Sequence, residues 1–385
     1  LVSRPDVLLL DEPTNHLDMD AIVWLEELLI GFKGSVVTIS HDRAFLNRVV
    51  TRIVELDRGK LLSYPGNFEA YGLQKEEQLA QEAVINAKAD KLLAQEEVWV
   101  RKGVEARRTR SQSRISRLQD LRSARSSRRD VVGRVRLDIS SAQSSGKIVA
   151  ELEGVSKRFG AGSAERTIVD NFNITILRGD KVGIIGPNGA GKTTLFRMIN
   201  GLETPDGGAL KIGETVEISY QDQSRTLEGK RTLWEEISGG RESITVGKRE
   251  MNSRAYAASL DFKGADQQKL VANLSGGERN RLHLAKTVLQ GGNLLLLDEP
   301  TNDLDVDTLR ALEDAVLDFS GCAVIISHDR WFLDRVATHI LAFEGDSETV
   351  WFEGNYGAYI EDLKRRKGPD ADMPTRIKYK KLVRS

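Results

Sequence analysis

The chain has 385 residues, of which 40% are hydrophobic and 29% charged, and its formal net charge is -1 at pH 7. This length suffices for about two domains, and the near-zero net charge excludes a general attraction of the whole molecule to nucleic acid. The single cysteine, Cys322, excludes a disulfide framework and is typical of the reducing cytoplasm, and no apolar run approaches the ~18 residues of a membrane-spanning helix.

The start of the chain repeats a later part almost residue for residue. Residues 8–18 (LLLDEPTNHLD) recur as residues 295–305 (LLLDEPTNDLD), and the Ser-His-Asp-Arg sequence at residues 40–43 recurs at residues 327–330. The offset is 287 residues in both pairs, so the two copies align over this stretch without a gap.

A further match, Gly-Asn-Phe at residues 66–68 with Gly-Asn-Tyr at residues 354–356, lies close to the end of the similarity. Residues 1–72 therefore correspond to the end of a unit whose complete copy spans residues 147–363. The first copy lacks its front part, so we expect the chain to be an N-terminally truncated fragment of a protein of about 550 residues.

Between the two copies the composition changes. Residues 74–100 are rich in Ala, Gln, Glu, Lys and Leu without Pro or Gly, which predicts a long helix. Residues 101–136 hold 13 Arg or Lys against three acidic residues, which favours an arm with a cationic tip that binds a polyanion. The alternative is a solvated spacer helix. The candidate RNA-binding residues are Arg101, Lys102, Arg107, Arg108, Arg110, Arg114 and Arg117.

A glycine-rich stretch in the complete unit, residues 186–194 (GPNGAGKTT), matches G-x-x-x-x-G-K-[ST] without a mismatch. An apolar run predicts a strand before it, and the residues from Thr194 on predict a helix after it. The N–H groups of such a loop and the positive end of the helix form a cradle for phosphate oxygens. Lys192 would reach the β- and γ-phosphates, and Thr193 would offer its hydroxyl to Mg²⁺. The candidate nucleotide-binding residues are Gly186, Pro187, Asn188, Gly189, Ala190, Gly191, Lys192, Thr193 and Thr194.

Acidic residues and a histidine follow two apolar runs of the complete unit. Asp298 would hold Mg²⁺ beside Thr193. Because side chains alternate along a strand, we expect Glu299 to point to the opposite side, as the general base for the water that attacks the γ-phosphate. We expect His328 to hydrogen-bond the γ-phosphate or that water. The repeat supplies a second set of the same residue types, namely Asp11, Glu12 and His41.

A second anion site is predicted where residues 274–278 (LSGGE) open another helix. The hydroxyl of Ser275 and the N–H groups of two glycines would hold phosphate there. One nucleotide cannot use both this turn and the phosphate loop if they lie far apart, so we expect two units face to face, each loop opposite the turn of the other. The residues of this turn are Leu274, Ser275, Gly276, Gly277 and Glu278.

These motifs together resemble those of ATP-binding cassette ATPases: GPNGAGKTT, LSGGE, LLLLDEP, TNDLD and SHD. Two such units in one chain, joined by a charged helical linker and without a membrane domain, resemble the ABC-F subfamily of translation factors. The resemblance covers nearly the whole chain. The complete copy at residues 147–363 and the linker are similar to two different branches of the subfamily, so the sequence does not decide between the branches.

The resemblance implies an α/β fold of P-loop NTPase cassettes, one partial and one complete, joined by a helical hairpin. It implies an ATPase that uses ATP and Mg²⁺. Gln223 matches the glutamine that senses Mg²⁺ and the γ-phosphate. Gln221 is the alternative position for this glutamine. Phe159 matches the aromatic residue that stacks on adenine, and residues 303–305 match the loop that communicates between the cassettes. The domains expected are residues 1–72, 73–146, 147–363 and a basic tail at 364–385.

The resemblance also implies partners. In the ABC-F subfamily the ATP-bound form sits in the ribosomal E site, and the linker contacts rRNA and P-site tRNA. Alternatives are an ATPase of the same subfamily that acts on branched DNA or in ribosome assembly, and the ATPase subunit of a transporter. Because the first cassette lacks its phosphate loop, we expect an isolated chain to hydrolyse ATP poorly unless two copies pair head to tail.

Overall fold

The computed structural model describes residues 5–15, 17–57, 59–102, 145–160, 166–221, 227–246, 249–345, 347–369 and 371. The chain divides into two compact units, one formed by Leu1–Phe45 with Arg134–Ser385 and the other by Leu46–Gly133. No helix among the described residues is long and apolar enough to cross a membrane.

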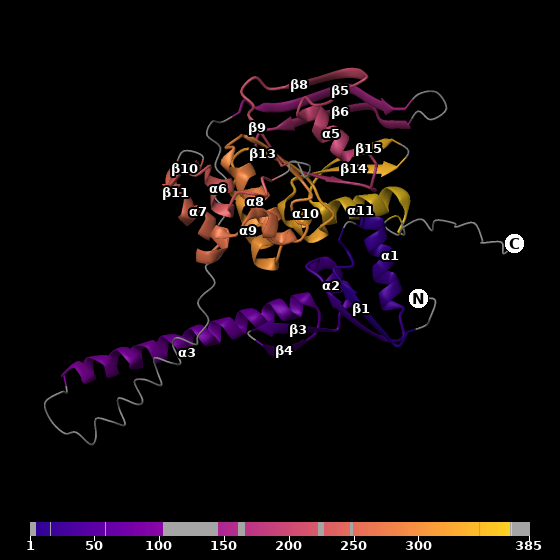
Figure 1. The fold of residues 1–385 in the computed structure, drawn as a ribbon. Coiled ribbons are helices and arrows are strands. Elements are labelled where there is room, and N and C mark those ends of the chain that lie inside the picture. The colour runs from indigo at the N-terminus through magenta and orange to yellow at the C-terminus, as the bar shows by residue number, and fades with distance from the viewer. Residues whose placement is uncertain are drawn as a thin grey trace. The chain divides into compact units, whose positions relative to one another are not determined.

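A six-stranded sheet in the order β15-β14-β7-β13-β12-β9 forms the centre of the first unit (Figure 1). All its neighbours pair in parallel except β14 and β15. Every residue of β7, β12 and β13 is buried, as expected for apolar strands covered on both faces. The strands are β7 (Lys181–Ile185), β9 (Ile218–Gln221), β12 (Leu294–Asp298), β13 (Cys322–Ile326), β14 (His339–Gly345) and β15 (Glu348–Glu353).

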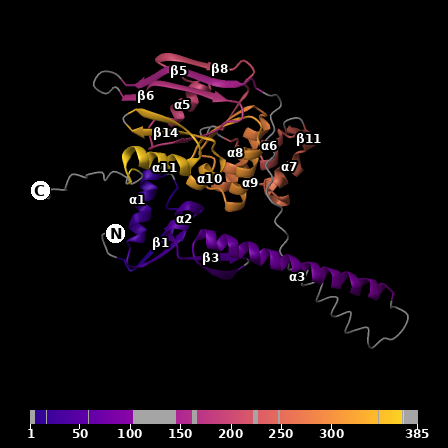
Figure 2. The ribbon, with the colours of Figure 1, turned by 180° about the vertical axis from the view of Figure 1, so that it is seen from behind.

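The two faces of this sheet pack into two separate cores. Leu294 and Leu296 belong to one core, and Leu295 and Leu297 belong to the other, because successive side chains of a strand point to opposite faces. The first core also includes helix α5 (Lys192–Ile199) and the antiparallel sheet of β5 (Ile148–Phe159), β6 (Arg166–Leu177) and β8 (Gly207–Ile212). Figures 1 and 2 show α5 between the two sheets.

Helices cover the opposite face of the central sheet. They and the small hairpin between them are α6 (Leu233–Ser238), β10 (Ser243–Val246), β11 (Arg249–Asn252), α7 (Ser253–Ser259), the 3-10 turns Gly264–Gln268 and Val271–Asn273, α8 (Gly276–Leu289), α9 (Val306–Asp318), α10 (Arg330–Val336) and α11 (Tyr356–Lys367). Their buried apolar residues form one core with Leu295 and Leu297. The expected α/β class is therefore confirmed.

The partial copy folds like its complete counterpart. Its elements are β1 (Val7–Asp11), α1 (Met19–Ile30), β2 (Ser35–Ile39) and α2 (Arg43–Val49). Strands β1 and β2 pair in parallel with Val7 opposite Ser35, and β12 and β13 pair with Leu294 opposite Cys322, 287 positions further on. The surroundings differ, because Leu9 is 77% exposed while its counterpart Leu296 is fully buried. One face of the β1–β2 ribbon is thus uncovered in this chain.

The second unit contains a hairpin and a long helix. Strands β3 (Arg52–Asp57) and β4 (Lys60–Pro65) are antiparallel, and α3 spans Phe68–Lys102. The side chain of Lys75 on α3 binds the carboxylate of Glu55 on β3 at 2.6 and 2.7 Å, and the ring of Tyr71 meets Tyr64 edge-on at 5.0 Å between centroids. The helix predicted at residues 74–100 is therefore present and begins earlier. Of the basic stretch at residues 101–136 that predicts the arm, residues 103–136 lie outside the described residues.

Candidate functional site

The phosphate loop connects β7 to α5 and has the backbone that its glycines allow. Gly186, Gly189 and Gly191 have φ of 143, 77 and 106°, a region that other residues rarely adopt. A Cβ on Gly191 would lie 1.9 Å from Cγ2 of Ile168, so the loop also needs glycine there for space. The Nζ of Lys192 donates to the carbonyl oxygens of Gly186 and Pro187 at 2.6 and 3.0 Å, which keeps it directly over the loop.

The start of α5 meets the end of β12. The Thr193 hydroxyl donates to Oδ2 of Asp298 at 3.3 Å, although 105 residues separate them in sequence. A hydroxyl and a carboxylate are the hard oxygen donors that suit Mg²⁺, which keeps water and substrate phosphates as its other ligands. No cluster of three or more His, Cys, Asp or Glu that could hold a metal occurs within the described parts of the chain.

Glu299 and His328 form a buried pair beside this point. The Nε2 of His328 lies 3.3 Å from Oε1 of Glu299. Burial, followed by the charge of Asp298, raises the pKa of Glu299 to about 8. Burial, followed by the charge of Lys192, lowers the pKa of His328 to about 4, so this imidazole is neutral at pH 7. Within the residues that the structure describes, Oε2 of Glu299 and Nδ1 of His328 are buried without a hydrogen-bond partner, as expected of groups that serve a ligand.

One expectation about Glu299 is wrong. The alternation of strand side chains does not set its direction, because β12 ends at Asp298. Glu299 instead has φ of 47°, in the left-handed region, and its counterpart Glu12 has φ of 43°. The backbone turns sharply after the strand and directs the carboxylate toward His328. A polar residue in a tight turn follows strand rules poorly, and the motif itself carried no sign of this conformation.

The equivalent residues of the partial copy, Asp11, Glu12 and His41, are arranged similarly, but His41 is more exposed to solvent than His328. The Nε2 of His41 lies 3.7 Å from Oε1 of Glu12, and the His41 backbone N–H donates to Oε2 of Glu12 at 3.3 Å. The His41 side chain is 44% exposed, against 12% for His328. Burial is the first cause that raises the pKa of Glu12. Asp11 ends β1, as Asp298 ends β12.

The partial copy and the complete copy meet at this site. Asp18 accepts a hydrogen bond from the backbone N–H of Asn188 in the phosphate loop at 3.2 Å, and Asn15 donates to Asp303 at 2.9 Å. A cavity of about 230 Å³ lies there. Equivalent residues of both copies line it, among them Thr14 and Thr301, Asn15 and Asn302, His41 and His328, and Asp42 and Asp329.

The LSGGE turn forms the start of α8. The Ser275 hydroxyl accepts the N–H of Glu278 at 3.2 Å, and the Glu278 carboxylate accepts the N–H of Ser275 at 2.8 Å, so the two residues cap the helix reciprocally. A Cβ on Gly277 would lie 2.5 Å from the carbonyl oxygen of Asp303, which explains why glycine is needed there. Leu274 is buried in the helical core.

The remaining predicted residues are only partly covered by the structure. Phe159 is an exposed ring at the end of β5, with Nζ of Lys157 5.3 Å from its centroid. Gln221 ends β9 opposite Leu297 of β12. Gln223 lies outside the described residues. So do Arg107, Arg108, Arg110, Arg114 and Arg117, while Arg101 and Lys102 end α3 without described side chains.

Sequence reasoning missed the contacts that join the two copies. Arg43 pairs with Glu313, and Arg330 pairs with Glu26. Both arginines stand in the repeated Ser-His-Asp-Arg sequence, where they marked the repeat but suggested no role. A glutamate on a buried apolar helix face, as Glu26 and Glu313 are, indicates that a cationic partner exists but not which residue it is.

The fold and this site define a P-loop ATPase of the ATP-binding cassette class. A family model described as ABC transporter matches residues 169–302, and another with the same description matches residues 54–136. The chain belongs to the ABC-F family of these proteins.

The relatives that support this assignment match almost the whole chain. It is 49% identical to the Energy-dependent translational throttle protein EttA of Escherichia coli K12 over 385 residues, covering 100% of this chain and 68% of the relative. It is 49% identical to EttA of Mycobacterium tuberculosis H37Rv, covering 100% and 69%. The ATP-binding protein Uup of Haemophilus influenzae is 47% identical over 357 residues, covering 92% and 55%. Both branches that the sequence left open are thus among the relatives.

Two solved structures share the fold. The RNase-L Inhibitor matches with a TM-score of 0.56 at 20% identity, over 93% of this chain and 62% of that one. An archaeal ribosome recycling factor, aABCE1, in complex with the ribosomal stalk protein aP1, matches with a TM-score of 0.55 at 21% identity, over 92% and 62%. At this identity they support the architecture alone.

Proposed function

We propose that the protein binds ATP with Mg²⁺, hydrolyses it to ADP and phosphate, and uses this cycle to bind the ribosome and regulate translation according to the ATP/ADP balance. The observation that carries the proposal is the buried Glu299–His328 pair beside the phosphate loop. The 49% identity to a translational throttle over the whole chain supports the translational role.

Binding would begin at the phosphate loop. Lys192 would exchange the loop carbonyls for the β- and γ-phosphate oxygens, which compensate its buried charge better than neutral carbonyls do. Thr193 and Asp298 would hold Mg²⁺ between them. The ion supplies neutralisation of the charge on the β- and γ-phosphates when it is bound. The exposed ring of Phe159 would stack on the adenine, and Gln223 would sense the γ-phosphate.

Hydrolysis would depend on the protonation states of the buried pair. Only the ionised form of Glu299 accepts a proton from the attacking water. With a pKa raised to about 8 this form is the minority at pH 7, but it is a stronger base than an exposed carboxylate and its share grows as pH rises. His328 stays neutral at physiological pH and donates an N–H to the γ-phosphate or the water. In the partial copy Glu12, His41 and Asp11 would have the equivalent tasks.

The contacts between the copies support a composite site. Asp18 of the partial copy already binds the phosphate loop of the complete copy at Asn188. The LSGGE turn, with Ser275 and the start of α8, would in the same way hold the phosphates of a nucleotide on another loop. That loop would belong to the preceding part of the first cassette, or to a second copy of this chain in head-to-tail pairing.

The basic linker would supply the contacts to RNA. Arg101, Lys102, Arg107, Arg108, Arg110, Arg114 and Arg117 would bind the phosphates of rRNA and P-site tRNA at the ribosomal E site. Lysine and arginine contacts to phosphate fix position without reading sequence, which suits such an arm. This function places the protein in the cytoplasm.

The test is trapping on the ribosome. Glu12→Gln with Glu299→Gln should bind ATP without turning it over, and the variant should then co-sediment with ribosomes only when ATP is present. Adding Lys192→Ala to the same variant is the matched control, because it removes ATP binding and should abolish co-sedimentation. Trapping on branched DNA in place of ribosomes would favour the alternative ATPase, and co-purification with a membrane protein would favour the transporter subunit.

A second experiment tests the arm. Replacing Arg107, Arg108 and Arg110 with Gln should weaken ribosome binding and flatten its salt dependence. Each phosphate contact that is lost lowers the number of counterions released when the protein binds RNA. An unchanged affinity and an unchanged salt slope would reject the arm as an RNA contact.

A further inference from the structure

Two arginine–glutamate pairs join the copies in a reciprocal arrangement. Arg43 and Arg330 occupy the same place in the repeat, and so do Glu26 and Glu313, each pair 287 residues apart. The guanidinium of Arg43 binds the carboxylate of Glu313 on α9. The guanidinium of Arg330 binds both carboxylate oxygens of Glu26 on α1, with Nη1 3.3 Å from Oε2. The arginine of each copy therefore binds a glutamate on a helix of the other copy.

These charges are removed from water. Glu26 and Glu313 are fully buried and Arg43 is 2% exposed, and the Arg43 guanidinium also lies 5.7 Å from the centroid of the Trp331 ring. A buried charge that loses its partner is strongly destabilising, whereas a buried pair is satisfied. The two pairs between the copies therefore form only when the copies are docked in this register, while Glu313 also binds Arg335 of its own copy.

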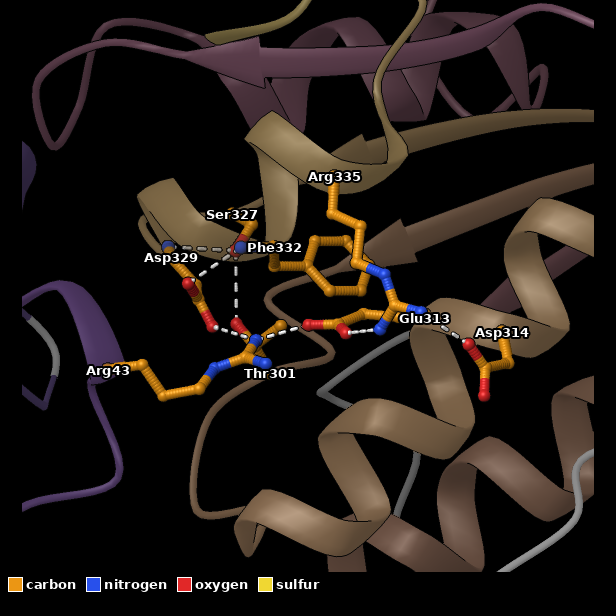
Figure 3. Close-up of polar contacts among 8 residues, drawn as sticks. All are labelled: Arg43, Thr301, Glu313, Asp314, Ser327, Asp329, Phe332 and Arg335. Carbon is orange, nitrogen blue, oxygen red and sulfur yellow. Dashed lines mark hydrogen bonds and ion pairs between the residues drawn. The ribbon is translucent and has the colours of Figure 1, made fainter. Parts of the chain in front are cut away.

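The arginines also lie close to the histidines of the site in sequence. Arg43 and Arg330 are the first residues of α2 and α10, two positions after His41 and His328. Asp329 caps α10 by accepting the N–H of Phe332 at 2.9 Å, and its other oxygen lies 3.6 Å from Nη2 of Arg43 (Figure 3). One guanidinium of the partial copy thus contacts both Glu313 and the residue that follows His328.

A hydrogen-bonded frame continues from this point to Glu299. The N–H of Asp329 donates to the Ser327 hydroxyl at 3.0 Å, and that hydroxyl contacts the Thr301 hydroxyl at 3.0 Å (Figure 3). Thr301 belongs to the turn after Glu299, and Ser327 precedes His328. The frame therefore fixes the two loops that carry the buried pair, and Arg43 reaches it from the other copy.

We propose that the pairs Arg43–Glu313 and Arg330–Glu26 form a latch that docks the two copies in one register, and that Arg43 is a positioning residue for His328. The positioning role rests on the proposed ATPase, whereas the latch itself does not. Arg335, which binds Glu313 and Asp314 within the complete copy, completes the charge balance around Glu313.

The latch is tested by amide hydrogen exchange of α1, with strand β12 as the reporter that the complete copy stays folded. Arg330→Gln takes the guanidinium away from the buried carboxylate of Glu26, so α1 should exchange at least about 100-fold faster while β12 is unchanged. Arg330→Gln with Glu26→Gln should exchange more slowly than Arg330→Gln alone, because neither charge then remains. The swapped pair Arg330→Glu with Glu26→Arg should recover part of the protection.

The matched control removes an arginine that pairs within one copy. Arg366 binds Glu344 at 2.7 Å, so Arg366→Gln should leave the exchange of α1 unchanged. Unchanged exchange of α1 in Arg330→Gln would overturn the latch, and so would a double variant whose effect equals the sum of the single effects.

The positioning role is tested by steady-state ATP hydrolysis of Arg43 variants. Arg43→Gln should lower kcat about 10- to 100-fold, as expected for a misplaced group, and should change KM for ATP by less than about twofold because the phosphate loop is untouched. Arg43→Lys should recover part of kcat, because lysine keeps the positive charge but lacks the planar guanidinium group with its paired N–H donors. Equal losses in kcat for Gln and Lys, or a loss in KM alone, would reject positioning. No turnover in the unaltered chain, at a concentration at which two copies pair, would reject the ATPase and the positioning role with it, and the exchange result would then decide the latch by itself.

Discussion

Gly191 at the end of the phosphate loop should not tolerate even a methyl group. Its φ of 106° already disfavours any other residue, at a cost of about 1–2 kcal/mol. In addition, the Cβ of Gly191→Ala would lie 1.9 Å from Cγ2 of Ile168, far inside van der Waals contact. Ile168 is buried in the core between the two sheets, so the loop and not the isoleucine must move.

The matched control is Gly201 just beyond the other end of α5. It has φ of 72°, and a Cβ there would meet nothing within 4 Å. Gly201→Ala therefore carries the backbone cost alone and should lower the free energy of unfolding by about 1–2 kcal/mol without weakening ATP binding. Gly191→Ala should weaken ATP binding at least about 100-fold, or about 2.7 kcal/mol.

Titration of a fluorescent ATP analogue measures both variants, with chemical denaturation for the free energy of unfolding. Adding Ile168→Ala to Gly191→Ala removes the overlap and should recover part of the affinity, while the backbone cost remains. Equal ATP affinity in Gly191→Ala and Gly201→Ala would refute the assignment of this loop as a tightly enclosed phosphate cradle.

Other predictions concern stability. Because the folded pKa of His328 is about 4 against 6.5 for the free residue, the unfolded chain binds the extra proton. The native state should then lose about 3 kcal/mol between pH 6.5 and 4, and His328→Gln should remove that loss in denaturation curves. Burial raises the pKa of Glu344, but hydrogen bonds from Arg366, Lys367 and Tyr359 outweigh it and hold the pKa at about 2. Glu344→Gln should therefore destabilise at pH 7, and the difference from the parent chain should shrink as pH falls from about 4.5 toward 2. Leu296→Ala should cost about 2–5 kcal/mol, and Leu9→Ala at the same repeat position less than about 0.5 kcal/mol; equal costs would contradict the difference in burial.

The parts of the fold with a strong local signal could be predicted from the sequence. Continuous apolar runs gave β12 and β13, and the absence of Pro and Gly gave the long helix α3. The phosphate-loop motif led to the Thr193–Asp298 contact because its strand, loop and helix come in a fixed order. The resemblance to the ABC-F family rests on these motifs and added Gln223, Phe159 and residues 303–305 to the candidate residues.

The contacts between the copies could not be predicted in this way. Arg43 and Glu313 are 270 residues apart, and nothing local to either residue indicates its partner. The same holds for Asp18 and Asn188, which meet only because the two copies dock. The turn at Glu299 was missed for another reason: an unfavourable φ is imposed by the surrounding fold, so local preferences give the wrong answer there.

In the catalytic roles proposed for Glu12 and Glu299, activity and stability make opposite demands at the same two positions, because both residues have a left-handed backbone. Glycine adopts this conformation without cost, so a chain optimised only for folding would discard both acids. Replacing either glutamate with glycine should relieve about 1 kcal/mol of conformational strain and also release a carboxylate from a buried place. A search for thermostable variants would therefore tend to select catalytically dead ones, and a screen of this protein for stability needs a turnover assay beside it.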